Sequence, residues 1–197
     1  MKELIKKMII TILFGNPLFR KGVTFGHNSY IREHSQIGGG KHIVLGNHTR
    51  ISPYARLMCF TKISGENLNP KLTIGDNVFI GRNCTISCSE TVEIGDDCLI
   101  TGYVFICDSE HGMNPEFGER YEKQPMIRKK TIIGKNVFIG EKAMIMPGVS
   151  IGDNCIVGAG SVVKKSFPND CMIVGNPAKC IKTYNYFTHQ WERTNNG

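Results

Sequence analysis

The sequence predicts an all-β protein, a parallel β-helix, and three observations support this fold class. Aliphatic residues recur every six positions from Ile133 to Val163, and a glycine follows four of these six residues. The same period runs from Ile74 to Ile86 and, after two extra residues, from Ile94 to Ile106, and the chain holds 22 glycines for the tight turns. A helix repeats every 3.6 residues and a strand every two, so neither produces this period. Hexapeptide repeats are typical of a parallel β-helix, in which each repeat supplies one short strand and one turn.

The first 22 residues are predicted to be an N-terminal amphipathic helix and linker. Apolar residues at positions 4, 5, 8, 9, 12 and 13 have helical spacing, and Asn16-Pro17 ends the helix. The apolar run is too short to span a bilayer, and no small-residue cleavage site follows it. Two interpretations stay open: the helix packs on the β-helix, or its lysines make a peripheral contact with a membrane.

Residues 23–182 are predicted to form the β-helix domain, with two interruptions. Residues 59–71 break the register and are expected to form a loop with a turn at Asn69-Pro70. Residues 107–131 are polar and rich in turn formers, so they are expected to be a long excursion loop. Residues 183–197 are expected to be a cap or tail with aromatic side chains, because terminal repeats need a cover.

The charge of the chain is concentrated at its ends. The formal net charge is +7, yet residues 23–163 hold 14 Lys and Arg against 14 Asp and Glu. A nucleic-acid reader would show a basic stripe along one face, so this class of function is excluded. A local basic cluster suits a phosphorylated cofactor or an acidic membrane surface.

The eight cysteines are interpreted as free thiols rather than disulfides. Cys84, Cys98 and Cys155 occupy the fifth position of their hexapeptides, where other repeats carry small apolar residues, so they are expected in the core. No CxxC pair suggests a zinc site. Free thiols point to the reducing cytoplasm, and a cytoplasmic protein is therefore expected.

One histidine lies in the long excursion and is the candidate general base. His111 follows the last regular strand position, Ile106, by five residues. Histidine titrates near neutral pH, and a neighbouring carboxylate can orient the ring and stabilise the imidazolium. The alternative is a solvated loop histidine without a task. Five carboxylates surround it in the sequence: Asp108, Glu110, Glu116, Glu119 and Glu122.

The other histidines do not suggest a metal site. Zinc needs three converging ligands, and nothing in the sequence brings these five together, so no metal is expected. They are His27, His34, His42, His48 and His189.

The segment 157–182 contains small residues and four lysines. Ala159 and Gly160 leave room for a thin ligand to approach the backbone. The lysines either meet phosphates or form a solvated basic rim. They are Lys164, Lys165, Lys179 and Lys182.

These features together resemble a known family. The repeats, the His111 loop, the run GAGSVV and the terminal VGNPAK are similar to the hexapeptide acyltransferases of the maltose and galactoside O-acetyltransferase group. They also resemble acetyltransferases of bacterial polysaccharide biosynthesis. The resemblance implies a left-handed β-helix, a homotrimer with active sites between neighbouring subunits, and acetyl-CoA as co-substrate.

The resemblance also implies roles for single residues. His111 matches the catalytic histidine, and Asp108 matches a carboxylate that precedes it by three residues in the polysaccharide-modifying branch. Asn83 lies in the coil on the acceptor side. Glu141 and Ala159 match backbone contacts to acetyl-CoA. The four lysines named above match residues that meet the cofactor phosphates, while Glu119 and Glu122 are candidates for the loop glutamate that holds the histidine.

The sequence therefore predicts an acetyl-CoA-dependent O-acetyltransferase that acts on a saccharide hydroxyl, with His111 as base and then acid. The acceptor, and the choice between a hydroxyl and an amine, stay open. Two other functions are considered: a zinc enzyme similar to γ-class carbonic anhydrases, and a β-helix scaffold without catalysis.

Overall fold

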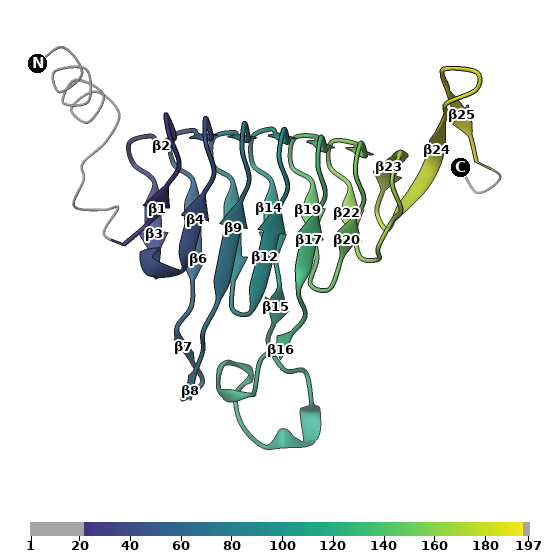
Figure 1. Cartoon of the computed structure of the whole chain (residues 1–197). Helices are drawn as coiled ribbons and strands as arrows, with labels where there is room; N and C mark the ends of the chain where they lie inside the picture. The colour runs from purple at the N-terminus through teal and green to yellow at the C-terminus, as the bar shows by residue number, and fades with distance from the viewer. Residues whose placement is uncertain (1–21, 195–197) are drawn as a thin grey trace, which may run out of the picture.

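Three β-sheets, in which the strands of successive coils pair in parallel, form the faces of a prism that runs along most of the chain (Figure 1). The computed structural model describes residues 22–194, so the predicted N-terminal helix lies outside the described residues. Successive strands of a coil enter the first, second and third sheet in turn, which means that the chain winds around the prism. The parallel β-helix predicted from the six-residue period is therefore confirmed.

The strands are short and stack in register from coil to coil. The first sheet has the order β1 (Thr24–Phe25), β4 (Ile43–Leu45), β9 (Lys71–Ile74), β12 (Thr91–Ile94), β17 (Thr131–Ile133) and β20 (Ser150–Ile151). The second has β2 (Tyr30–Ile31), β5 (Arg50–Ile51), β10 (Phe79–Ile80), β13 (Leu99–Ile100), β18 (Phe138–Ile139), β21 (Ile156–Val157), β23 (Cys171–Gly175), β24 (Ala178–Asn185) and β25 (Gln190–Arg193). The third has β3 (Gln36–Gly38), β6 (Arg56–Cys59), β11 (Thr85–Cys88), β14 (Phe105–Cys107), β19 (Met144–Ile145) and β22 (Val162–Val163). One 3-10 helix, η2 (Gly40–His42), turns the chain between β3 and β4.

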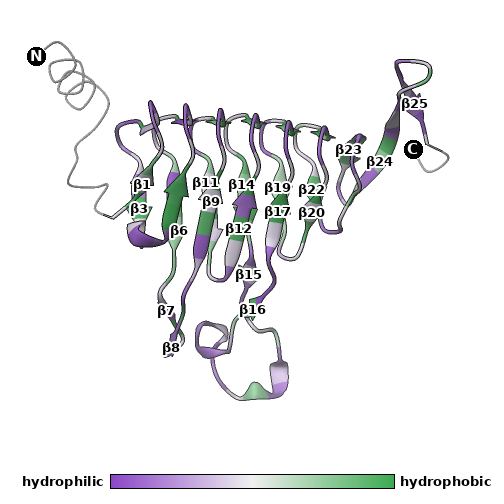
Figure 2. Cartoon of the chain, viewed as in Figure 1, coloured by the Kyte–Doolittle hydropathy of each residue, from purple (hydrophilic) through white to green (hydrophobic). Residues whose placement is uncertain are grey.

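The periodic aliphatic residues fill the interior of the prism. In the first sheet Ile74, Ile94, Ile133 and Ile151 stack in register, and each is at most 2% exposed. The second and third sheets carry equivalent ladders, and Figure 2 shows hydrophobic residues on the strands and hydrophilic ones at many corners. Burial of these ladders, at about 25 cal/mol for each Å² of apolar surface removed from water, is the main force that closes each coil.

Acidic side chains at the corner between the first and second sheets join one coil to the next. The Asp76 carboxylate accepts a hydrogen bond from the Asn47 N–H at 2.6 Å, and Asp96 accepts one from the Asp76 N–H at 2.9 Å. Asp153 accepts one from the Lys135 N–H at 2.7 Å. The aspartate that follows the repeat glycine thus satisfies backbone donors that the turn leaves unpaired.

Both predicted interruptions leave the prism at the corner between the third and first sheets. The first forms an antiparallel pair, β7 (Lys62–Ile63) and β8 (Glu66–Asn67), and not an irregular loop. Its tight turn is at Ser64-Gly65, where both φ angles are positive, whereas we expected a turn at Asn69-Pro70. The second interruption opens with the antiparallel pair β15 (Ser109–Glu110) and β16 (Ile127–Arg128). It continues through η3 (Pro115–Phe117) and η4 (Tyr121–Lys123).

The chain after the last coil forms a β-meander on the edge of the second sheet. β23, β24 and β25 pair in antiparallel order, and the hairpin extends past the coils (Figure 1). The boundary that we predicted between residues 182 and 183 falls inside β24. Tyr184 and Trp191 meet edge to face, with ring centroids 5.5 Å apart.

The cysteines have the environment that the sequence predicts. Cys84, Cys98 and Cys155 are at most 1% exposed, and all eight thiols are free. Burial raises the pKa of Cys84 and of Cys98 to about 11. These thiols are therefore compact core side chains, protonated at neutral pH. Within the described residues, we find no helix with the length and apolar character needed to cross a membrane.

Candidate active site

Asp108 anchors the excursion loop to the preceding coil. Its side chain is fully buried, and its two oxygens accept hydrogen bonds from the backbone N–H of Ser89, at 2.8 and 3.1 Å, and of Glu90, at 2.8 Å. The loop starts at Asp108 and returns to it, since the Lys129 N–H donates to the Asp108 carbonyl oxygen at 2.8 Å. This carboxylate satisfies the backbone N–H groups at a sharp corner of the neighbouring coil, and its hydrogen bonds are directed there and not to His111.

A buried glutamine holds the two arms of the loop together. The Gln124 amide oxygen accepts from the Asn114 N–H, and its amide nitrogen donates to the Asn114 carbonyl oxygen, both at 3.0 Å. Gln124 is 3% exposed. A Cβ at Gly112 would come within 2.7 Å of the Pro125 carbonyl oxygen, so only glycine permits this approach. The chain on both sides of His111 is therefore fixed by contacts to the opposite arm.

His111 itself is exposed, directly after β15. Among residues 22–194, its ring has no hydrogen-bond or ion-pair partner. The direct support by Asp108 that we expected is therefore not seen. Of the loop glutamates, Glu119 pairs with Lys123 at 2.9 Å, and Glu122 with Arg120 at 2.7 Å. An exposed imidazole on a braced loop can accept a proton from a bound hydroxyl.

The β7–β8 hairpin supports the same loop at two places. The Ser64 hydroxyl donates to the carbonyl oxygens of Glu122 and Gln124, at 2.9 and 3.2 Å. Arg128 on β16 pairs with Glu66 on β8 at 2.8 Å. The hydrogen bond from Arg128 lowers the pKa of Glu66, and the same contact raises the pKa of Arg128. The two interruptions of the repeat thus form one connected unit.

Three predicted site residues lie on a different edge of the prism. Asn83, Glu141 and Ala159 occupy corners between the second and third sheets, whereas His111 leaves from the corner between the third and first. Glu141 and Ala159 belong to neighbouring corners, because the Gly160 N–H donates to the Glu141 carbonyl oxygen at 2.8 Å. Asn83 has a φ of 57°, a conformation that asparagine tolerates well, which gives its identity a structural reason.

The lysines divide into two groups. Lys165 and Lys179 line a groove of about 570 Å³ together with Ser166, Phe167 and Thr194. Lys164 and Lys182 are not among its lining residues. Residues 164–166 lie at the corner from which the His111 loop also leaves, two coils further along, or roughly 10 Å at the spacing of neighbouring strands. The two ammonium groups beside the hydroxyls of Ser166 and Thr194 fit a phosphorylated ligand.

The remaining histidines make local contacts. The rings of His27 and His48 meet edge to face at 5.8 Å, and His34 stacks on Tyr54 at 5.0 Å. No group of three His, Cys, Asp or Glu side chains suited to a metal ion occurs within the described part of the chain.

Comparisons with known proteins show the family of the chain. The profile described as "Bacterial transferase hexapeptide (six repeats)" matches residues 130–165, and "Hexapeptide repeat of succinyl-transferase" matches residues 71–106. WbbJ of Escherichia coli (strain K12), a protein named for O-acetyl transfer in lipopolysaccharide biosynthesis, is 31% identical over 193 residues, 95% of this chain and 92% of WbbJ. The chain belongs to the hexapeptide-repeat acetyltransferases. The repeats and the neighbours imply that this acetyltransferase β-helix is left-handed.

This acetyltransferase is also similar to two proteins that transfer acyl groups to different acceptor atoms. A galactoside O-acetyltransferase of Escherichia coli (strain K12) is 38% identical over 121 residues, which span 61% of this chain but only 56% of that protein. The solved structure of a variant of AntD, an N-acyltransferase from Bacillus cereus in complex with dTDP and coenzyme A, superposes with a TM-score of 0.70 at 26% identity. It covers 95% of this chain and 91% of AntD.

Sequence reasoning did not find four polar residues at the base of the acetyltransferase's loop. Glu66, Ser89, Glu90 and Arg128 line a groove between the two interruptions. The sequence pattern that points to this groove is that residues 59–71 and 107–131 both break the repeat at equivalent corners. Gln124 carried no signal, because its role depends on contacts across ten residues of loop.

Proposed function

We propose that the protein is an acetyl-CoA-dependent O-acetyltransferase for a saccharide hydroxyl, with a role in bacterial surface polysaccharide biosynthesis in the cytoplasm. The observation that carries this proposal is the relationship to WbbJ along nearly the whole chain. The exposed His111 on the braced loop, and the lysine groove along the same edge, supply the required chemistry. The CoA-bound structural neighbours support acetyl-CoA as the donor.

In the proposed mechanism His111 takes the proton of the acceptor hydroxyl as its oxygen attacks the thioester carbonyl. The C–S bond breaks, and the imidazolium returns the proton to the departing sulfur. The backbone N–H of Ala159 is suited to stabilise the charge on the carbonyl oxygen, because the N–H groups of Gly158, Gly160 and Ser161 already donate to carbonyl oxygens of the prism. Lys165 and Lys179 hold the phosphates of the donor. Asp108 and Gln124 act as positioning residues, since each contacts backbone and not the reacting atoms.

We propose a homotrimer for a geometric reason. The corners with Asn83, Glu141 and Ala159 and the edge with His111 lie on opposite sides of the third sheet. A groove between two neighbouring copies brings one edge of each copy together, and cyclic symmetry repeats that groove at every interface.

The test of the function is acetyl-CoA turnover with a panel of methyl glycosides, amino sugars and nucleotide sugars. His111→Ala is expected to lower kcat by about 10² to 10⁴ with unchanged affinity for acetyl-CoA. His189→Asn is the matched control, because His189 is exposed in a hairpin turn with a φ of 54°, which asparagine tolerates. Acetyl transfer to amines alone would establish N-acylation instead, and wild-type turnover by His111→Ala would refute the assigned base.

Shared sites give a second, independent test. His111→Ala and Ala159→Trp damage opposite edges, so each variant alone is expected to be inactive. In trimers that contain both variants at random, about one quarter of the interfaces pair an intact His111 with an intact Ala159. Mixed refolding should therefore restore about a quarter of wild-type activity, whereas a site within one chain would restore none.

A further inference from the structure

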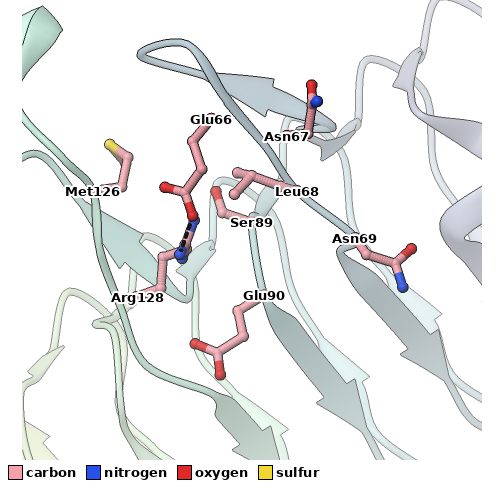
Figure 3. A pocket seen from close by; sticks show the side chains of 8 residues that line it. All are labelled: Glu66, Asn67, Leu68, Asn69, Ser89, Glu90, Met126 and Arg128. Carbon is pink, nitrogen blue, oxygen red and sulfur yellow. Dashed lines mark hydrogen bonds and ion pairs between the residues drawn. The ribbon is translucent and has the colours of Figure 1, made fainter.

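The two interruptions of the repeat enclose a polar groove of about 500 Å³ (Figure 3). Three successive corners between the third and first sheets build it. The β7–β8 hairpin forms one wall, the β15–β16 pair forms the other, and the tight corner at Ser89-Glu90 forms the floor. The walls leave the prism two coils apart, which is roughly 10 Å at the strand spacing of a sheet. Such a groove has room for one small ring-shaped ligand.

An incompletely paired guanidinium lies in this groove. Arg128 Nη2 donates to Glu66 Oε1 at 2.8 Å, as Figure 3 shows. Arg128 Nη1 is buried and has no hydrogen-bond partner among the described residues. A buried donor without a partner is unfavourable. The Arg128 side chain as a whole is 25% exposed and lines the groove, so its guanidinium gains a hydrogen bond if it turns toward an oxygen atom of a ligand there.

The groove lies beside the proposed base. Arg128 pairs with Ser109 across the two-stranded ribbon, and the Ser109 hydroxyl meets the Ser89 hydroxyl on the floor at 2.9 Å. His111 follows Ser109 by two residues, so its Cα is roughly 8 Å from that of Arg128 at ordinary strand dimensions. A ligand that contacts Arg128 can therefore present a second group to His111.

The charge and composition of the lining define the ligand. Glu66 and Glu90 carry two negative charges against the single positive charge of Arg128, so the groove is anionic overall. Asn67, Asn69 and Ser89 offer donors and acceptors, and Leu68 and Met126 offer apolar contact. This combination suits a ring with several hydroxyls and C–H groups, and it repels a carboxylate or a phosphate.

We propose that this groove binds an uncharged sugar ring of the acceptor, with Arg128 and Glu66 as hydrogen-bonding partners of its hydroxyls. The proposal rests on the saccharide acetyltransferase function above and specifies its acceptor. Acidic sugars, and the phosphates of a nucleotide-linked sugar, are excluded from the groove itself.

The first experiment compares two arginines of the same excursion loop. Arg128→Gln is expected to raise the KM for a neutral methyl glycoside by about 10- to 100-fold, as for a hydrogen bond to a charged group, and to leave the KM for acetyl-CoA unchanged. Arg120→Gln is the matched control, because Arg120 pairs with Glu122 on the exposed tip, 75% exposed and outside the groove. Equal KM values for Arg128→Gln and the wild type would overturn the proposal.

The second experiment uses variants that leave the Arg128–Glu66 brace intact. Asn67→Ala and Glu90→Gln change exposed side chains, so the fold is expected to be retained. Asn67→Ala should raise the KM for the neutral glycoside by about 2- to 10-fold. Glu90→Gln should lower the KM for methyl glucuronide relative to that for methyl glucoside, because one repulsive charge is removed. A wild-type enzyme that prefers the glucuronide would refute an uncharged acceptor.

Failure of the function and failure of the groove give different results. If the wild-type enzyme acetylates glycosides and the groove variants keep its acceptor KM, the function stands and the groove proposal falls. If no saccharide is acetylated, saturation-transfer NMR with the same methyl glycosides still shows whether the groove binds a sugar ring. Binding that Arg128→Gln removes and Arg120→Gln retains supports the groove, and no binding to the wild type rejects it.

Discussion

Asp108→Asn distinguishes a carboxylate that braces the loop from one that orients His111, the proposed base. The structure assigns Asp108 to the brace, because its oxygens accept three hydrogen-bond contacts from the backbone of Ser89 and Glu90. Asparagine has the same shape but replaces one acceptor oxygen with a donor. The NH₂ group of the asparagine then faces a backbone N–H of Ser89 or Glu90, and that buried N–H loses its acceptor.

The magnitude follows from that single lost acceptor. A hydrogen bond to a charged group contributes about 1.5 to 3 kcal/mol, and the lower desolvation cost of a neutral amide offsets part of the loss. We expect Asp108→Asn to lower the free energy of unfolding by about 2 kcal/mol. Asp97→Asn is the control, because Asp97 is exposed and accepts one contact at 3.0 Å, from the Asn77 amide. Its effect should stay within about 0.5 kcal/mol.

The assay is urea denaturation of both variants at one protein concentration, because the stability of an oligomer depends on concentration. Turnover against pH is measured in parallel at a temperature where Asp108→Asn is folded. If Asp108 braces the loop, Asp108→Asn should have lower stability and lower kcat, while the acidic limb of its pH–rate profile stays at the wild-type pH. Wild-type stability together with a downward shift of that limb would show that Asp108 acts on His111 directly and that the structural argument is wrong.

Two further predictions concern the lysine groove and the core thiols. The double variant Lys165→Ala, Lys179→Ala should raise the KM for acetyl-CoA at least about 10-fold in steady-state kinetics, whereas Lys164→Ala, outside the groove, should have a smaller effect. Equal effects of the two would contradict a phosphate site in the groove. Burial raises the pKa of Cys84 to about 11, so at pH 8 its thiolate is scarce and mass spectrometry after iodoacetamide treatment should find Cys84 unmodified. The half-exposed Cys180 should react first, and rapid labelling of Cys84 in the folded protein would refute its burial.

The sequence predicts the prism well because each repeat position has one environment. Ile100 pairs with Ile80 on one side and Ile139 on the other, so the same side chain is required at each level. Local sequence and long-range packing therefore require the same residue type at each repeat position, and the period identifies the buried residues. Cys98 fits this rule as well, since its small side chain fills an interior position at 1% exposure.

The candidate site is predicted less completely, for a physical reason. His111 could be identified as a candidate, because one histidine in a long polar excursion is visible in the sequence. The partners of Asp108 could not be identified, since they are backbone groups of a corner 19 and 18 residues earlier. The pairing of Glu66 with Arg128 joins residues 62 positions apart in two interruptions without repeat register. Contacts outside the repeat produce no periodic pattern in the sequence.

The same property explains why the His111 loop and the groove beside it lie on one edge of the prism. Residues inside the prism are fixed by their neighbours above and below, so a polar group there would disturb several coils at once. An interruption at a corner is free of that constraint, and two interruptions on either side of a short corner form walls around a floor. The tight turn at Ser89-Glu90 is therefore as important to the groove as the longer segments beside it. Asp108 accepts hydrogen bonds from the backbone N–H groups of that turn, so one carboxylate stabilises both the His111 loop and the floor of the groove.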